Sequence, residues 1–124
     1  MSHDTTHLYD PTRALALAGG RAELRDATLL GLLDLLDDPA GRLLDVEQYA
    51  QETPACYEVA HRAVGLARQA ATPALETLLR ALTEALDAGA LTEARRLGQR
   101  LPAAIAAVRS VLADLQPAPH WPLE

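Results

Sequence analysis

The sequence predicts an all-α protein, an antiparallel up-down four-helix bundle with a short extra helix at its N-terminus. Three observations indicate this fold. Apolar residues make up 49% of the chain and are mostly leucine and alanine, whereas phenylalanine is absent and strand-forming residues are few. These apolar residues recur three and four positions apart, which places them on one side of a helix. Helix start signals, aspartate or threonine before proline, recur between glycine stop signals, which indicates several helices with short connections.

The N-terminal half is predicted to form a short helix followed by a longer, interrupted one. Asp10 is a good N-cap and Pro11 suits the first helical position, while the glycine pair at residues 19–20 ends this helix. Helical spacing then continues over residues 22–51. The acidic segment 37–41, which contains proline and glycine, interrupts this spacing, so we expect one broken helix or two short ones.

Two further helices are predicted to begin at threonine–proline pairs. Thr53 and Thr72 are the expected N-caps, each followed by a proline at the first helical position. The first of these helices carries an apolar stripe as far as Ala70. The second runs to Ala88 and stops at Gly89.

The C-terminal part is predicted to form one last helix that ends near residue 115. Thr92 is its expected N-cap, and Pro102 predicts a kink inside it, because proline lacks a backbone donor and crowds the preceding turn. We therefore expect one domain over residues 8–115. A disordered N-terminus over residues 1–7 and an extended, proline-rich tail over residues 116–124 would flank it.

Charge and composition exclude several classes of partner. The net charge of −6 argues against nucleic acid, since binding to phosphate backbones requires clustered lysine and arginine. No apolar run reaches the roughly 20 residues that cross a membrane, and residues 1–10 lack the apolar core of a signal peptide. The single cysteine, Cys56, cannot form an internal disulfide. We therefore expect a cytoplasmic monomer that binds neither nucleic acid nor membranes.

The helix that begins near Thr53 carries a candidate site at His61. Gly65 and Arg68 follow His61 by four and seven residues and share its side of the helix, since a helix turns by about 100° per residue. A glycine in mid-helix costs about 1 kcal/mol relative to alanine, and open access to His61 would justify that cost. Arg62 and Arg68 can place positive charge beside the imidazole. The apolar stripe lies largely on another side and contains Val59, Ala63, Leu66 and Ala70.

Residue chemistry alone leaves the role of this histidine open. Exposed imidazole is mostly unprotonated at neutral pH, and the unprotonated ring nitrogen is a nucleophile. Glu58, one turn before His61, could favour the protonated ring or orient it. A solvated histidine without function, and a glycine at which another helix packs closely, explain the same residues.

The pentapeptide His61-Arg62-Ala63-Val64-Gly65 resembles the signature of histidine-containing phosphotransfer domains: a histidine, a basic residue, two variable positions and a glycine. The likeness is greatest to the terminal domains of tripartite hybrid sensor kinases and covers residues 8–115. Its other supporting segments are Tyr9-Asp10-Pro11, the stretch 14–20, Glu23-Leu24, and Thr72-Pro73 with Leu75, Leu78 and Leu82.

This resemblance implies both a fold and an activity. The family fold is an up-down four-helix bundle preceded by a short helix. His61 would accept a phosphoryl group from a receiver-domain aspartate and pass it on, with Arg62 and Arg68 as electrostatic helpers and Gly65 providing clearance. The partners would be receiver domains of response regulators and hybrid sensor kinases. The chain itself would bind no cofactor or metal and turn over no substrate, because the receiver supplies the magnesium ion.

The chain departs from the family pattern at three places. Ala71 stands where many members have a second glycine, Val64 occupies a position that is often polar or histidine, and residues 37–51 are less regular than usual. These departures bear on which receivers dock. Two rival functions are a docking module that inhibits a receiver or kinase without being phosphorylated, and an unrelated helical adaptor.

Other chemistry-bearing residues have simpler interpretations. Cys56 lies on the apolar stripe and is expected to be a small core residue. His3 and His7 have a metal-ligand spacing, but in a segment expected to be disordered. Three aspartates near the first interruption suggest a cation site or a solvated acidic helix end: Asp34, Asp37 and Asp38. The partner kinase or regulator, the direction of phosphoryl flow and whether the chain is free-standing are left open.

Overall fold

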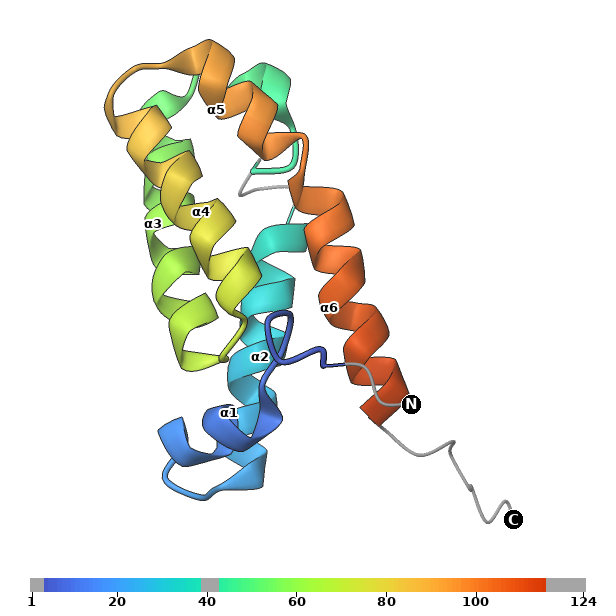
Figure 1. Cartoon of the computed structure of the whole chain (residues 1–124). Helices are drawn as coiled ribbons and strands as arrows, with labels where there is room; N and C mark the ends of the chain where they lie inside the picture. Colours follow the sequence, from blue (N-terminus) through green and yellow to red (C-terminus); the bar gives the residue numbers. More distant parts are fainter. Residues whose placement is uncertain (1–3, 39–42, 116–124) are drawn as a thin grey trace, which may run out of the picture.

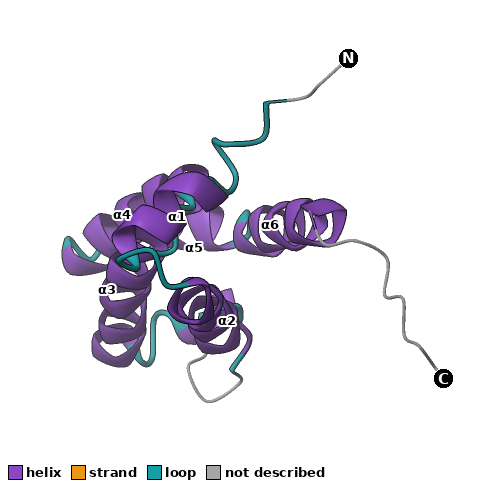
Figure 2. Ribbon diagram, turned by 90° about the horizontal axis from the view of Figure 1, so that it is seen from below, coloured by secondary structure: helices purple, strands orange, loops and turns teal. Residues whose placement is uncertain are grey.

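The computed structural model describes residues 4–38 and 43–115 (Figure 1). These residues form six α-helices and one 3-10 helix and contain no strand, so the predicted all-α class is confirmed (Figure 2). In chain order the elements are α1 (Pro11–Leu17), α2 (Ala22–Asp37), η1 (Val46–Gln48), α3 (Thr53–Gln69), α4 (Pro73–Asp87), α5 (Leu91–Gly98) and α6 (Leu101–Leu115).

The most extensive contacts between helices of the described chain are those of α3 with α4, of α4 with α5, and of α2 with α3. The contact between α3 and α4 is the most extensive, and α2 packs against α3 on the other side. Helix α6 contacts α4 and stands to one side of α2, α3 and α4 in both ribbon views (Figures 1 and 2). Helix α1 lies beside α2 at one end, while α5 and η1 contact each other at the opposite end. Helix α3, which carries His61, is therefore held between two neighbours.

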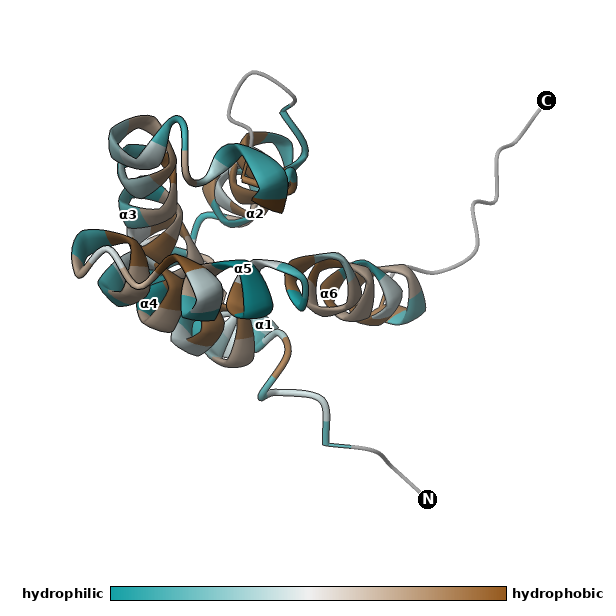
Figure 3. Ribbon diagram, turned by 90° about the horizontal axis from the view of Figure 1, so that it is seen from above, coloured by the Kyte–Doolittle hydropathy of each residue, from teal (hydrophilic) through white to brown (hydrophobic). Residues whose placement is uncertain are grey.

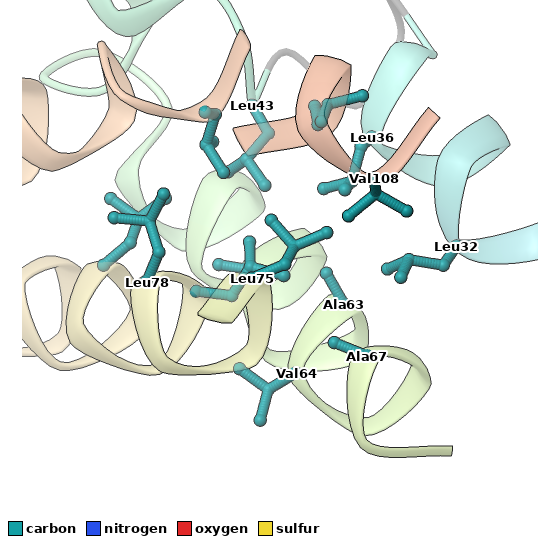
Figure 4. Close-up of a cluster of buried hydrophobic side chains, with 14 of the residues drawn as sticks. Leu32, Leu36, Leu43, Ala63, Val64, Ala67, Leu75, Leu78 and Val108 are labelled. Carbon is teal, nitrogen blue, oxygen red and sulfur yellow. The ribbon is translucent and has the colours of Figure 1, made fainter. Parts of the chain in front are cut away.

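The interior is made mainly of leucine and alanine, as the apolar periodicity predicts. Hydrophobic and hydrophilic residues occur together on the same helices (Figure 3). Fully burying one leucine side chain stabilises a fold by about 1.5–3 kcal/mol, so this leucine-rich interior supplies much of the driving force. Residues drawn in the core in Figure 4 include Leu32 and Leu36 of α2, Ala63 and Ala67 of α3, Leu75 and Leu78 of α4, and Val108 of α6.

The predicted start and stop of α1 are both confirmed. Asp10 accepts a hydrogen bond from the backbone N–H of Arg13 at 3.0 Å, and Pro11 is the first helical residue. Gly19 and Gly20 end the helix with φ values of 67° and 82°, a left-handed conformation that glycine adopts without strain.

Replacing Asp10 with alanine should lower the free energy of unfolding by about 1 kcal/mol, because the Arg13 N–H loses its partner. Urea denaturation of the two proteins measures this difference. Asp10→Ser, which keeps a capping oxygen, should restore most of the lost stability. A variant with alanine at this position and wild-type stability would contradict the capping role.

The predicted N-cap position is confirmed for Thr72 and wrong for Thr53. The N-cap position of α3 is Glu52, and Thr53 is already helical, with its hydroxyl donating to the Tyr49 carbonyl. Thr72 does precede α4, but its buried hydroxyl donates to the Ala67 carbonyl at 3.1 Å. Each hydroxyl donates to a carbonyl of the preceding turn, and Thr72 makes no side-chain capping hydrogen bond to α4.

The helical pattern expected over residues 43–51 is also wrong, apart from the single 3-10 turn of η1. The Tyr49 side chain is fully buried, and its hydroxyl donates to the Leu43 carbonyl at 2.6 Å. This hydrogen bond folds the segment back on itself, so that the phenol ring enters the core. The predicted interruption at 37–41 lies partly outside the described residues.

The final helix is two helices, and the prediction of one kinked helix is wrong. Helix α5 ends at Gly98 and α6 begins at Leu101, so Pro102 is the second residue of α6. A proline at the start of a helix needs no backbone donor, whereas inside a longer helix it would disrupt the ladder. Thr92 lies within α5, whose N-cap position is Ala90.

Residues 4–10 pack their backbone against the turn between α3 and α4. Asp10 N–H donates to the Ala71 carbonyl at 2.9 Å, and Ala74 N–H donates to the His7 carbonyl at 2.8 Å. Ala71 has a φ of 58°, the left-handed region in which glycine is favoured. Residues 1–3 and 116–124 lie outside the described residues.

The buried tyrosines predict a loss of stability at alkaline pH. Burial raises the pKa of Tyr49, and burial also raises the pKa of Tyr9. In the unfolded chain both phenols lose their protons near pH 10, so above that pH the unfolded state binds fewer protons than the folded state. The free energy of unfolding should be unaffected by these groups below about pH 10 and fall above it. Urea denaturation at pH 8, 10 and 11 measures the decline, which should be shallower in Tyr49→Phe.

Candidate functional site

His61 lies in the middle of α3 on its solvent side. The residue is exposed, whereas the core-facing residues Ala60 and Ala63 next to it are fully buried. Its ring makes no hydrogen bond within residues 4–38 and 43–115. Both ring nitrogens are therefore open to solvent or to an approaching molecule, and neither is committed to holding the fold together.

The surface beside His61 is bare at Gly65. Gly65 is exposed, and a Cβ placed on it would meet no atom within 4 Å. The alternative that this glycine admits a closely packed neighbouring helix is therefore contradicted for the described residues. Since internal packing does not require glycine here, the cost of a mid-helix glycine remains unexplained unless something outside the chain approaches.

Tyr57 stacks on the imidazole, a contact that the sequence analysis missed. The ring centroids of Tyr57 and His61 are 5.8 Å apart and the two planes are inclined by only 10°. The four-residue spacing between them is the signal that could have revealed the pair, because residues i and i+4 are neighbours on a helix. In contrast, Glu58 makes no hydrogen bond or ion pair with His61 in the described part of the chain.

Two exposed arginines of α3, Arg62 and Arg68, follow His61. Arg62 is exposed and has no ion pair with any described residue. Arg68 Nε lies 3.5 Å from Glu76 Oε2, and the same carboxylate also pairs with Arg80 of α4. One carboxylate thus serves two guanidinium groups, which leaves a net positive charge on this cluster. Such a surface attracts an anionic group brought to His61.

A shallow apolar groove lies between α1, α2 and the C-terminal end of α3. Its volume is about 230 Å³, and α1, α2 and α3 contribute to its walls. Leu17 of α1 and Leu24 of α2 line it and are 39% and 44% exposed. On α3 the groove is lined by Leu66, which belongs to the apolar stripe, and by Gln69. The complete lining is Leu17, Ala18, Leu24, Thr28, Leu66 and Gln69.

The other candidate residues are not brought together into a site. No group of three or more histidine, cysteine, aspartate or glutamate side chains suited to a metal ion occurs among the described residues. Asp37 pairs with Arg109, and Cys56 is fully buried, as its position on the apolar stripe predicts. His3 lies outside the described residues. Within residues 4–38 and 43–115, none of the helices has the length and apolar character of a membrane span.

Comparisons with known proteins identify no relative. No family model, no curated protein and no solved structure matches this chain.

Proposed function

We propose that this protein is a phosphorelay carrier that accepts a phosphoryl group on His61 from a receiver-domain aspartate and passes it to a response regulator. The observation that carries the proposal is the exposed His61 imidazole with the empty surface of Gly65 one turn away. We further propose that α2, α3, α4 and α6 act as an up-down four-helix bundle with α1 as the extra N-terminal helix. The protein would be a cytoplasmic monomer without a cofactor of its own.

Phosphoryl transfer requires of the carrier only a correctly placed imidazole and nearby positive charge. A lone pair on an unprotonated ring nitrogen of His61 attacks phosphorus, and the bond between phosphorus and the aspartate oxygen breaks. The aspartate leaves as a carboxylate with the electron pair. Magnesium bound to the receiver would stabilise most of the charge that develops, and Arg62 and the Arg68–Glu76–Arg80 cluster would attract the phosphoryl group electrostatically.

The surroundings of His61 suit a receiver domain as the visiting partner. Phosphorus must approach the ring nitrogen to about 3–3.5 Å before transfer, so a folded donor has to come into close contact with α3. The bare backbone at Gly65 permits that approach. The groove and the exposed leucines Leu17 and Leu24 supply apolar area that the partner would cover.

Transfer of labelled phosphate tests the proposal. The wild-type chain and His61→Gln are incubated with a receiver domain that carries a radioactive phosphoryl group. We expect the wild type to acquire an acid-labile, alkali-stable label and the variant to acquire none.

The same assay separates the rival functions when receiver binding is measured in parallel. Receivers that bind the wild type without transferring label would indicate the inhibitory docking module. Receivers that neither bind nor transfer would indicate an unrelated helical adaptor. Label on both proteins would place the acceptor elsewhere in the chain.

A further inference from the structure

We propose that Tyr57 is a positioning residue for phosphoryl transfer, because its stacked ring holds the His61 imidazole in the orientation that presents a ring nitrogen to the donor. This inference rests on the proposed function of His61. The juxtaposition that carries it is the near-parallel pair of rings, 5.8 Å apart between centroids and inclined by 10°.

Tyr57 is anchored, whereas His61 is not. Tyr57 is partly buried and packs against the hydrophobic core, while His61 is exposed and has no hydrogen bond to any described residue. Both residues belong to the same helix, one turn apart, so the backbone between them is rigid. The contact thus connects the exposed imidazole to a ring that packs against the core.

An imidazole on a helix surface otherwise samples several orientations. Two staggered χ1 positions are usual in a helix, and the second torsion of histidine is broad and roughly twofold. Offset-parallel aromatic rings attract each other, so the stack favours one of these orientations over the rest. Transfer requires the nitrogen lone pair to point along the line of the phosphorus–oxygen bond that breaks. Fixing the ring before the donor arrives therefore raises the fraction of encounters that are productive.

Tyr57 takes no part in the bonds that form and break during phosphoryl transfer. The nitrogen–phosphorus bond forms, the phosphorus–oxygen bond to the aspartate breaks, and the carboxylate takes the electron pair. The proton on the other ring nitrogen stays in place or passes to water. Tyr57 contributes orientation alone, so its hydroxyl should be dispensable and its ring should not.

The experiment therefore compares a variant that loses only the hydroxyl with a variant that loses the aromatic ring. Tyr57→Phe keeps the stacked ring, and Tyr57→Leu keeps apolar contact with the core but removes the ring. Tyr57→Leu is chosen over Tyr57→Ala because it leaves a smaller cavity. The His61 ring protons, assigned by their absence in His61→Gln, are followed by NMR, and label transfer from a phosphorylated receiver is timed for each variant.

We expect the His61 ring protons to keep their ring-current shift in Tyr57→Phe and to lose it in Tyr57→Leu. Acceptance of phosphoryl groups should slow by about three- to fivefold in Tyr57→Leu and stay near the wild-type rate in Tyr57→Phe. Equal rates in the wild type and Tyr57→Leu would overturn the positioning role, and so would ring protons that do not respond to loss of the aromatic ring. Should Tyr57→Leu not fold, a Tyr57→Phe protein that transfers several-fold more slowly than the wild type would overturn it as well. If the proposed function itself is wrong, the wild type acquires no label from any receiver, which distinguishes that outcome from loss of the positioning role.

Discussion

Replacing Gly98 with alanine is expected to lower the free energy of unfolding by about 2–3 kcal/mol. Overpacking and a weakened hydrogen bond lower this free energy, and the better helix propensity of alanine offsets part of the loss. A Cβ on Gly98 would lie 2.8 Å from Val46 Cγ1 and 2.9 Å from Tyr49 Cζ, and closer still to the Tyr49 hydroxyl. Tyr49 cannot retreat, because its side chain is fully buried and its hydroxyl donates to the Leu43 carbonyl. The added methyl group must therefore displace α5 from η1 or break that hydrogen bond.

Gly65→Ala is the matched control for this prediction. The same added methyl group would meet no atom within 4 Å at Gly65, so only the gain in helix propensity remains. The free energy of unfolding should rise by about 0.5–1 kcal/mol. Urea denaturation of the wild type and both variants at one pH measures the two opposite effects. A Gly98→Ala protein as stable as the wild type would contradict the close approach of α5 to Tyr49.

Replacing Gly65 with glutamine is expected to slow phosphoryl transfer from a receiver to His61 by more than about tenfold while the protein stays folded. The glutamine side chain would project from the face that carries His61, into space that is empty in the free protein. A docking receiver needs that space, and even about 1 Å of displacement at the reacting atoms greatly slows transfer. Rates of label transfer to the wild type, Gly65→Ala and Gly65→Gln should fall in that order.

Two controls separate lost clearance from other causes. Phosphoramidate is a small donor that needs no docked protein, so it should label His61 in Gly65→Gln at nearly the wild-type rate. Ala113→Gln adds the same bulk on an exposed position of α6 and should leave transfer from the receiver unchanged. Wild-type transfer to Gly65→Gln would contradict the clearance role of Gly65.

The helices that the sequence predicted correctly are those whose signals are local. Asp10 with Pro11 and the glycine pair at residues 19–20 delimit α1, and the leucine spacing after Pro73 delimits α4. Each signal acts within one or two turns of the chain, through a cap, a missing donor or a left-handed glycine. Such signals can therefore be interpreted from the sequence without knowing which elements pack against the helix.

The predictions that failed involve contacts between distant segments. Residues 43–51 have helical spacing, yet burying the Tyr49 ring beneath α5 outweighs the weak preference of a short helix. The break between α5 and α6 belongs to the same contact, because Gly98 lies directly against Tyr49 at that point. The Thr53 cap is the exception, because it failed locally: Thr53 is already the first residue of α3, and its hydroxyl donates to the Tyr49 carbonyl four residues earlier.

The features of the candidate site also divide into those that follow from local sequence and those that depend on a second helix. The positions of His61, Gly65 and Arg68 on one side of α3 follow from helical geometry, and the burial pattern of α3 agrees with it. The neutralisation of Arg68 by Glu76, and the sharing of Glu76 with Arg80, involve a second helix and could not be derived from spacing within α3. The Tyr57 stack was within reach of sequence reasoning, as an aromatic residue four positions before the histidine.

For this protein the sequence alone determined the helical class, the solvent-facing side of His61 and the glycine beside it, because a 3.6-residue period and local caps decide these features. The tertiary structure decided that Arg68 pairs with Glu76, that no atom of the described residues lies within 4 Å of a Cβ at Gly65, and where the last predicted helix divides. These features depend on which side chains from distant segments occupy the same volume, and close packing of the chain settles that competition.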